Sequence, residues 1–324
     1  MRVTPEMIDP ELRLRGRITD IVNTRSTEAA YRKHVRRTRK VLRLLEGRSV
    51  RDASTSTVDV PRHSGTGAIR TRIVRPPGDG QHAGDRPSRP GVLWLHGGGY
   101  AVGIPEIDAN THRILAKELG CIVVAPDYRL SIDAPYPAAL DDCYDTLLWM
   151  HRSAGELGLD RERIVVGGGS AGGGLAAAIS LRARDTGEVR IAVQLPLYPM
   201  IDDRMITDSA RENDAPVWNS ATNRWAWRLY LGDRAEDDVP AYAAPARAAD
   251  LRGLPRTVTF VGDLDPFRDE TIAYVERLRA ADVPVDFELF EGCYHGFETV
   301  CPDATVSRRA RAFWTGALER ALER

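Results

Sequence analysis

Short apolar runs recur through the chain between residues 91 and 265, and they determine the fold class. Each is rich in β-branched residues and bounded by Gly, Pro or Asp: GVLWLHG, CIVVAPDYR, RIVVGGGS, IAVQLPLYP and TVTFVGDLD. Runs that are apolar on both faces are typical of buried parallel strands. Helical stretches follow them, at 108–119, 138–153, 172–185 and 268–281. This alternation predicts an α/β fold with a mostly parallel central sheet flanked by helices.

Further elements complete this sheet and cover it. The alternating stretch AIRTRIVRP predicts a half-exposed strand, and VDFELF predicts the last strand. A final helix is predicted at about 304–322, packed at the edge of the sheet. The polar stretch GDGQHAGDRPSRP is expected to be a loop.

Two segments do not follow this alternation. Residues 1–50 are rich in Arg with helical periodicity, which predicts two helices lying on a larger body. Residues 200–240 hold three of the six tryptophans and show no strand pattern. This segment is interpreted as an inserted helical piece, with either an ordinary packing role or a role as lid or acyl-pocket wall.

The charge balance gives no sign of a polyanionic partner. Basic and acidic residues number 45 and 46, for a net charge of −1, which argues against nucleic acid and membrane partners. The basic run YRKHVRRTRK could face an anionic partner, but a solvated helix face is the favoured interpretation. No apolar run reaches the roughly 18 residues that span a bilayer. The first residues lack the apolar core of a signal peptide, so a cytoplasmic protein is expected. Cys121, Cys143, Cys293 and Cys301 form no C-x-x-C pair and are expected to be free thiols, although Cys293 and Cys301 could pair in an oxidising setting.

A candidate nucleophile lies in the stretch RIVVGGGSAGGGLAAAI. Ser170 occupies the centre of a G-x-S-x-G motif between a predicted strand and an Ala-rich helix. That context is the one in which a sharp strand-to-helix turn exposes a serine hydroxyl. A glycine-rich phosphate turn is the alternative, but no Lys follows as in a P-loop, and a dinucleotide loop would follow the first strand.

A serine hydroxyl needs a base, and His295 is the only histidine after Ser170. It follows the predicted last strand, in the chain order nucleophile, acid, histidine. The orienting acid is expected after the strand TVTFVG, where Asp263, Asp265, Asp269 and Glu270 are available. Asp269 and Glu270 fall in the first turn of the next helix, where acids stabilise the helix dipole. Asp263 and Asp265 are therefore the better candidates, and spacing does not separate them.

The stretch LWLHGGGYAVG supplies candidate donors for a developing oxyanion. Gly97 and Gly98 follow a predicted strand and bring backbone N–H groups close to a substrate without an intervening side chain. The N–H of Ala171, the residue after the nucleophile, would complete the oxyanion hole. His96 is interpreted as a structural anchor of this loop.

These motifs together resemble the hormone-sensitive-lipase-like (family IV) esterases of the α/β-hydrolase superfamily. HGGGY, DYRLSIDAPYPAALDD, GGSAGGGLAAA, DLDPFRDE and HGF are similar to the family's boxes over residues 92–297. The resemblance implies Ser170 as nucleophile, His295 as base, Asp265 as the triad acid, and Gly97, Gly98 and Ala171 as oxyanion donors. It also implies a helical cap, formed by residues 1–50 and the insertion at about 200–240 over a catalytic domain of residues 51–324.

The sequence departs from the family pattern at two places. Gly169 stands where the family has an acidic residue or threonine, and Ser131-Ile132-Asp133 replaces A-P-E. The first departure could loosen support around the nucleophile, and the second could alter the loop at the floor of the site. Neither removes a triad member.

The prediction is a serine carboxylesterase that acts on short-to-medium acyl esters of small molecules. No metal or cofactor is expected, and the family resemblance favours a homodimer. An amidase or deacetylase acting on a specialised metabolite is one alternative, because the same triad serves a different leaving group. A non-hydrolytic ligand-binding protein on this scaffold is the other, although such proteins typically lack the base that His295 provides.

Overall fold

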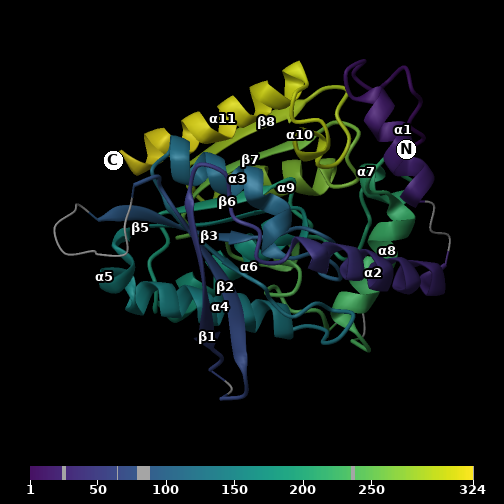
Figure 1. The fold of residues 1–324 in the computed structure, drawn as a ribbon. Coiled ribbons are helices and arrows are strands. Elements are labelled where there is room, and N and C mark those ends of the chain that lie inside the picture. The colour runs from purple at the N-terminus through teal and green to yellow at the C-terminus, as the bar shows by residue number, and fades with distance from the viewer. Residues whose placement is uncertain (24–26, 64, 79–87, 235–237, 324) are drawn as a thin grey trace.

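The computed structural model describes residues 1–23, 27–63, 65–78, 88–234 and 238–323, and an eight-stranded sheet forms its centre (Figure 1). The strand order is β1-β2-β4-β3-β5-β6-β7-β8. Strands β3 to β8 pair in parallel, and β1 and β2 pair antiparallel at one end. The strands are Ser54–Pro61 (β1), Ala68–Arg75 (β2), Arg89–Leu95 (β3), Ile122–Pro126 (β4), Leu159–Gly169 (β5), Val193–Leu197 (β6), Arg256–Gly262 (β7) and Val285–Phe290 (β8).

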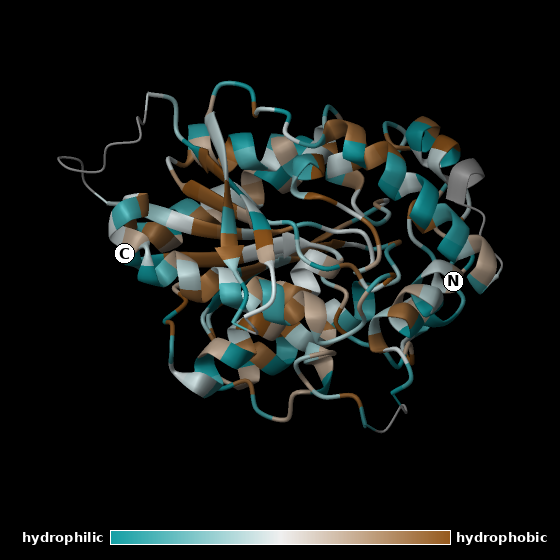
Figure 2. Ribbon diagram, turned by 60° about the horizontal axis from the view of Figure 1, so that its bottom comes forward, coloured by the Kyte–Doolittle hydropathy of each residue, from teal (hydrophilic) through white to brown (hydrophobic). Residues whose placement is uncertain are grey.

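Helices cover both faces of this sheet. Along β3, Val92 and Trp94 belong to one hydrophobic cluster, and Leu93 and Leu95 belong to the other, as a period of two requires. The first cluster is closed by α3, the π-helix η3 and α11; the second by α4, α5 and α6, while α9 packs with α6 in a third. Figure 2 shows brown strands enclosed by helices with mixed teal and brown surfaces. These helices are Ala109–Arg113 (α3), Ile114–Glu118 (η3), Ala138–Arg152 (α4), Ala154–Leu157 (α5), Ala171–Thr186 (α6), Arg268–Ala280 (α9) and Thr305–Leu322 (α11).

The predicted α/β fold is confirmed, and each of the seven predicted strands is present. Two details differ from the prediction. The strand β1 was not predicted, because most of its residues, STSTVDVP, are polar. Only Val60 of this strand is fully buried, and Val58 packs in part against the core. The strand β2 is not half-exposed, because both of its faces are covered: Ile73 packs in one core cluster and Val74 in the other.

Helices of the two irregular segments lie side by side. The N-terminal segment contains Arg13–Asn23 (α1), Glu28–Leu42 (α2) and the 3-10 turn Arg43–Leu45 (η1). The segment at 200–240 contains Asp208–Arg211 (α7) and Ser220–Leu231 (α8), and no strand among its described residues. Helix α2 packs on α8, and both lie at the same side of the molecule in Figure 1. Residues 24–26 and 235–237, which belong to these predicted segments, and most of the predicted loop at 78–90 lie outside the described residues.

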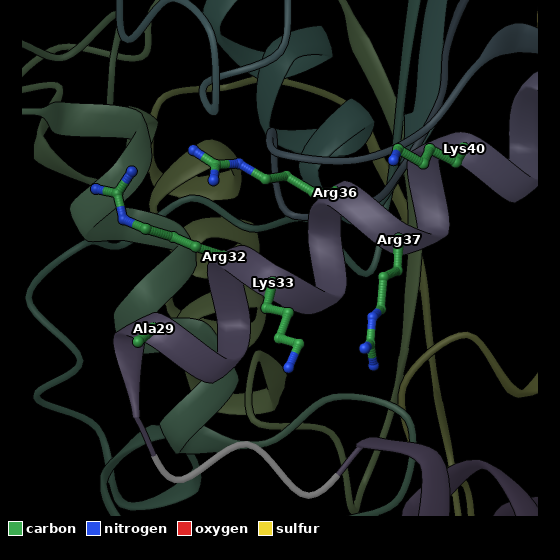
Figure 3. Close-up of a pocket in the computed structure, with 6 residues that line it drawn as sticks. All are labelled: Ala29, Arg32, Lys33, Arg36, Arg37 and Lys40. Atoms are coloured by element: carbon green, nitrogen blue, oxygen red, sulfur yellow. The ribbon is translucent and has the colours of Figure 1, made fainter.

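The basic run of α2 forms a solvent-facing surface. Tyr31 and Val35 are buried, and the cationic side chains occupy the remaining faces of the helix. Figure 3 shows the residues that line a shallow pocket there: Ala29, Arg32, Lys33, Arg36, Arg37 and Lys40. Among these residues, Arg32 alone forms an ion pair within the described chain, with Glu28 at 2.8 Å. None of the helices in the described ranges is both long and apolar enough to cross a membrane.

Candidate active site

Ser170 lies at the turn between β5 and α6. Its backbone adopts φ 59° and ψ −122°, a conformation that a residue with a side chain adopts only under strain. The surrounding backbone enforces this turn, since Ser170 N donates to Leu197 O at 3.0 Å and Met200 N donates to Ser170 O at 3.0 Å. The side chain is 7% exposed, so its hydroxyl reaches the bottom of a cavity and not open solvent.

His295 and Asp265 form a continuous hydrogen-bonded chain with this serine. The distance from Ser170 Oγ to His295 Nε2 is 2.8 Å, and that from His295 Nδ1 to Asp265 Oδ2 is 2.7 Å. The other oxygen of Asp265 accepts from Phe267 N at 2.9 Å, which fixes the carboxylate. His295 and Asp265 are buried, so water does not compete for these bonds. The three residues come from the ends of β5, β7 and β8, whose carboxyl ends meet at one edge of the parallel sheet.

The other three acidic residues of the β7–α9 region accept hydrogen bonds from backbone N–H groups away from His295. Asp263 accepts from Cys293 N at 3.2 Å and does not contact the His295 ring. Asp269 accepts from Ser209 N at 2.8 Å. Glu270 accepts from the N–H groups of Ile201 and Asp202 at 3.0 and 3.3 Å. The prediction that Asp269 and Glu270 serve the dipole of their own helix is therefore incomplete, because both carboxylates bind the segment at 200–210.

The predicted oxyanion donors lie next to the serine. A Cβ built on Gly97 would lie 3.4 Å from Ser170 Cβ. Gly98 has φ +114°, and a Cβ there would lie 1.7 Å from Val102 O, so only glycine fits this turn. Within the described residues, the backbone N–H groups of Gly97, Gly98 and Ala171 donate to no other atom. Unpaired amides beside a nucleophile can bind an oxyanion.

His96 holds the glycine loop and does not reach Ser170. Its Nδ1 lies 2.8 Å from Gly97 O, and its ring stacks on Tyr128 at 4.1 Å. The Tyr128 hydroxyl donates to His96 O at 2.7 Å. Burial lowers the pKa of His96 to about 4, so the ring is neutral near pH 7.

A tyrosine side chain fills the space beside Gly169, the first position at which the sequence departs from the family pattern. A Cβ built on Gly169 would lie 2.7 Å from the Tyr198 hydroxyl oxygen, so the phenol ring occupies the space that a side chain at 169 would need. Tyr198 donates to Glu298 Oε1 at 2.6 Å and packs edge-on against the His295 ring at 5.1 Å. The sequence analysis expected that Gly169 could loosen the support around Ser170. That support is given by Tyr198, directly after β6, and by Glu298 of α10, Phe297–Val300.

The departure at Ser131-Ile132-Asp133 ties a loop to the N-terminal segment. Ser131 N donates to Tyr100 O at 2.8 Å, which joins this loop to the glycine loop. Asp133 forms an ion pair with Arg39 of α2. Ile132 packs at the border of the core cluster that contains Tyr31.

A cavity of about 600 Å³ opens onto these groups. Its wall includes Ser170, His295, Gly97, Gly98, Tyr198 and Trp218, and also Asp108 and Glu298, whose side chains sequence analysis did not single out. Glu298 could have been noticed because it stands three residues after His295, but Asp108 carries no motif. No group of three or more His, Cys, Asp or Glu side chains in the described ranges is placed to hold a metal ion.

The four cysteines are buried free thiols. The hydroxyl of Tyr294 lies 3.4 Å from Cys301 Sγ. Cys293 Sγ instead lies 3.3 Å from Glu291 O, so the alternative pairing of Cys293 with Cys301 is not present. Cys121, Cys293 and Cys301 contribute to the core cluster beneath α11, and Cys143 contributes to the cluster on the other face of the sheet.

Comparison with known proteins agrees with this architecture. Residues 92–299 match the family model described as alpha/beta hydrolase fold. Esterase LipI of Mycobacterium tuberculosis is 38% identical over 245 residues, which is 74% of each chain. A solved bacterial heroin esterase superposes with a TM-score of 0.87 at 37% identity, covering 99% of both chains. Esterase LipW of Mycobacterium marinum superposes with a TM-score of 0.85 at 31% identity, covering 99% of this chain and 98% of that one. The chain therefore belongs to the α/β-hydrolase family, in its hormone-sensitive-lipase-like (family IV) branch.

Proposed function

We propose that this protein is a serine carboxylesterase that hydrolyses short-to-medium acyl esters of small molecules. The observation that carries the proposal is the hydrogen-bonded chain from Ser170 through His295 to Asp265, at 2.8 and 2.7 Å, on the wall of a cavity. A volume of about 600 Å³ is in the range of small-molecule sites. The names of the similar proteins, which include esterases, support the same activity.

In the proposed mechanism, Ser170 Oγ attacks the ester carbonyl while His295 Nε2 takes its proton. Asp265 fixes the imidazole tautomer and stabilises the imidazolium without itself taking the proton. The amides of Gly97, Gly98 and Ala171 bind the oxyanion, each contributing about 2.7–4 kcal/mol in the transition state. His295 then gives its proton to the leaving alcohol. Water, activated by the same base, releases the acid from the acyl-enzyme.

The helical segments at 1–50 and about 200–240 are proposed to form a cap over this site. Trp218, from the second segment, lies 6.1 Å from the His295 ring. Tyr230 of α8 stacks on Tyr100 of the glycine loop at 3.8 Å. Tyr31 of α2 belongs to the same buried cluster as Trp218. The second segment thus packs against the loop that carries the proposed oxyanion donors, and the first segment packs on the second through α2 and α8. We propose residues 51–324 as the catalytic domain, with the cap inserted at about 200–240.

The test is hydrolysis of p-nitrophenyl esters, from acetyl to dodecanoyl, by wild type and Ser170→Ala. Activity should be greatest at short chains, and the variant should lose several orders of magnitude in kcat, keeping about 10³–10⁴-fold over water from the oxyanion hole and binding. Circular dichroism establishes that both proteins are folded. A folded wild type without activity on any ester, or a variant as active as wild type, would overturn the proposal.

A further inference from the structure

The cavity that exposes Ser170 also contains two carboxyl groups from different elements. Asp108 ends the 3-10 helix Pro105–Asp108 (η2), and Glu298 lies on α10. Burial raises the pKa of Asp108, and the negative charge of Glu298 raises it further. Neither belongs to the hydrogen-bonded chain of Ser170, His295 and Asp265.

Each carboxyl receives its side-chain hydrogen bonds on one oxygen, and Glu298 Oε1 receives a second one, from Thr299 Oγ1 at 3.3 Å. Trp94 Nε1 donates to Asp108 Oδ2 at 2.9 Å, and the Tyr198 hydroxyl donates to Glu298 Oε1 at 2.6 Å. Oε2 of Glu298 is buried and has no hydrogen-bond partner among the described residues. Asp108 Oδ1 likewise receives no hydrogen bond within the described ranges. These fixed carboxyls therefore have unused acceptor capacity.

The two arginines on the cavity wall bond to other groups and do not pair with Asp108 or Glu298. Arg113 pairs with Glu118 at 3.1 Å, and Arg311 donates to Pro302 O at 2.9 Å. Asp303, also on the wall, adds a further acid. No ion pair joins Asp108 or Glu298 to a cation in the described part of the chain. Burying a carboxylate without a counter-ion is costly, so a cation entering the cavity would be stabilised there.

The aromatic lining adds a second, independent feature suited to a cation. The indole rings of Trp94, Trp218 and Trp314 and the phenol of Tyr198 all contribute to the wall. Aromatic faces attract a positively charged nitrogen through their quadrupole, and quaternary ammonium groups are bound in such surroundings. The three indole rings and the two carboxyls without a paired cation therefore make this cavity suited to a positively charged group.

We propose that this cavity selects esters whose acyl or alcohol part carries a positively charged nitrogen, with Asp108 and Glu298 as counter-ions. The proposal rests on the esterase function proposed above. The two carboxyls act as specificity-determining residues and take no part in the chemical step. If they only satisfied the buried Trp94 and Tyr198 donors, the enzyme would not distinguish a cationic ester from a neutral one of the same shape.

The test compares matched esters that differ by one atom. Acetylcholine is paired with 3,3-dimethylbutyl acetate, and p-nitrophenyl 4-(trimethylammonio)butyrate with p-nitrophenyl 5,5-dimethylhexanoate, so that N⁺ replaces C. For at least one pair at pH 8, the ratio of kcat/KM, cationic over neutral, should exceed the ratio for hydroxide-catalysed hydrolysis at least tenfold. Hydrolysis of the neutral esters without this excess in either pair would overturn the substrate class and leave the esterase proposal intact. A folded enzyme that hydrolyses none of the four would instead contradict the esterase proposal.

Conservative variants then locate the preference. Asp108→Asn and Glu298→Gln keep an acceptor for Trp94 and for Tyr198, and each should lower the ratio at least fivefold. Glu291→Gln removes the same charge from an exposed residue of the β8–α10 connection and should leave the ratio as in wild type. Retention of the wild-type ratio in both cavity variants would overturn the proposal. If neither variant folds, competitive inhibition of neutral-ester hydrolysis by tetramethylammonium chloride, absent with equal sodium chloride, provides the test on wild type.

The preference should also depend on pH. Burial, with the charge of Glu298, raises the pKa of Asp108 to about 7, and burial raises that of Glu298. Below pH 7 Asp108 is protonated and neutral, and above it the carboxylate attracts the cation. The other titratable or charged groups on the cavity wall are His295, Arg113, Arg311 and Asp303, and the ratio compares two esters in the same surroundings at each pH. The ratio should therefore rise several-fold from pH 6 to pH 8.5, and a flat ratio would contradict the role of Asp108.

Discussion

At the scale of single residues, the environment of His295 decides which neighbouring acid faces it. The order of nucleophile, acid and histidine leaves Asp263 and Asp265 equivalent, because both follow β7 within three residues. In the structure, the β7–α9 turn directs Asp265 to Nδ1 of the ring and Asp263 to the backbone of Cys293. Two residues of separation thus place the carboxylates on different partners. Only the backbone path of the turn, which residue order does not specify, separates them.

Substitution of these two aspartates should have very different effects. Asp265→Asn removes the charge that stabilises the imidazolium and permits the wrong tautomer, so kcat should fall about 10⁴-fold. Asp263→Asn keeps an oxygen that accepts from Cys293 N at 3.2 Å, so kcat should change less than tenfold. Steady-state kinetics on a p-nitrophenyl ester measures both. The assignment of Asp265 fails if Asp263→Asn is the more damaging change.

At the scale of elements, strands with apolar side chains on both faces were predictable and polar ones were not. The runs that became β3 to β7 lie between two helical layers, so hydrophobicity alone marks them. β1 pairs only with β2 at the end of the sheet, and one of its eight residues, Val60, is fully buried. Such a strand is stabilised mainly by its ladder to β2, and a backbone ladder leaves no hydrophobic pattern in the sequence.

Polar contacts between elements could not be predicted from the sequence either. Acids in the first turn of α9 fit a local role, yet Glu270 is buried and accepts from two backbone N–H groups of the segment after β6. Asp108 and Glu298 reach the active-site cavity in the same way, from elements that are far apart in sequence. Long-range partners of this kind depend on how helices pack on the sheet.

The contact of Glu270 should contribute substantially to stability. Burial raises the pKa of Glu270 well above its ordinary value. Glu270→Ala leaves the N–H groups of Ile201 and Asp202 without a partner and should lower the free energy of unfolding by about 2–6 kcal/mol, at roughly 1–3 kcal/mol for each. Glu270→Gln should cost less, because its amide oxygen still accepts.

Urea unfolding at pH 7, followed by circular dichroism, measures these differences. Glu276→Ala is the matched control, since Glu276 is exposed on the same helix and should change the free energy of unfolding by less than about 0.5 kcal/mol. Equal stabilities for Glu270→Ala and Glu276→Ala would show that the Glu270 bonds do not stabilise the segment at 200–210.

At the scale of the whole molecule, the site depends on a sheet that collects residues 97–298 at one edge. The motifs predicted the order of these residues, and parallel strands with right-handed crossovers leave few ways to arrange them. The family resemblance therefore named candidate catalytic residues, whereas it did not predict the side chains that surround them. Gly169 illustrates the limit, because the Tyr198 ring that takes the place of a side chain there comes from the residue directly after β6.

The two ends of the sheet differ, and this difference bears on assembly. β1 ends one side with polar residues and Pro61, features that discourage pairing with another chain. β8 ends the other side with no further strand on its outer edge in the described chain, and its Leu289 is 37% exposed. An unpaired edge with an exposed leucine favours pairing with a second copy, and a homodimer through β8 would continue the sheet across both subunits.

Sedimentation equilibrium tests this arrangement. Wild type at micromolar concentration should sediment as a species of twice 35.8 kDa. Leu289→Lys places a charge on the edge and should shift the protein to the monomer, because lysine on an edge strand opposes pairing. Leu14→Lys is the matched control: Leu14 is 71% exposed on α1, far along the chain from β8, and its substitution should leave the dimer intact. Monomeric wild type, or a Leu289→Lys protein that remains dimeric, would contradict pairing through β8.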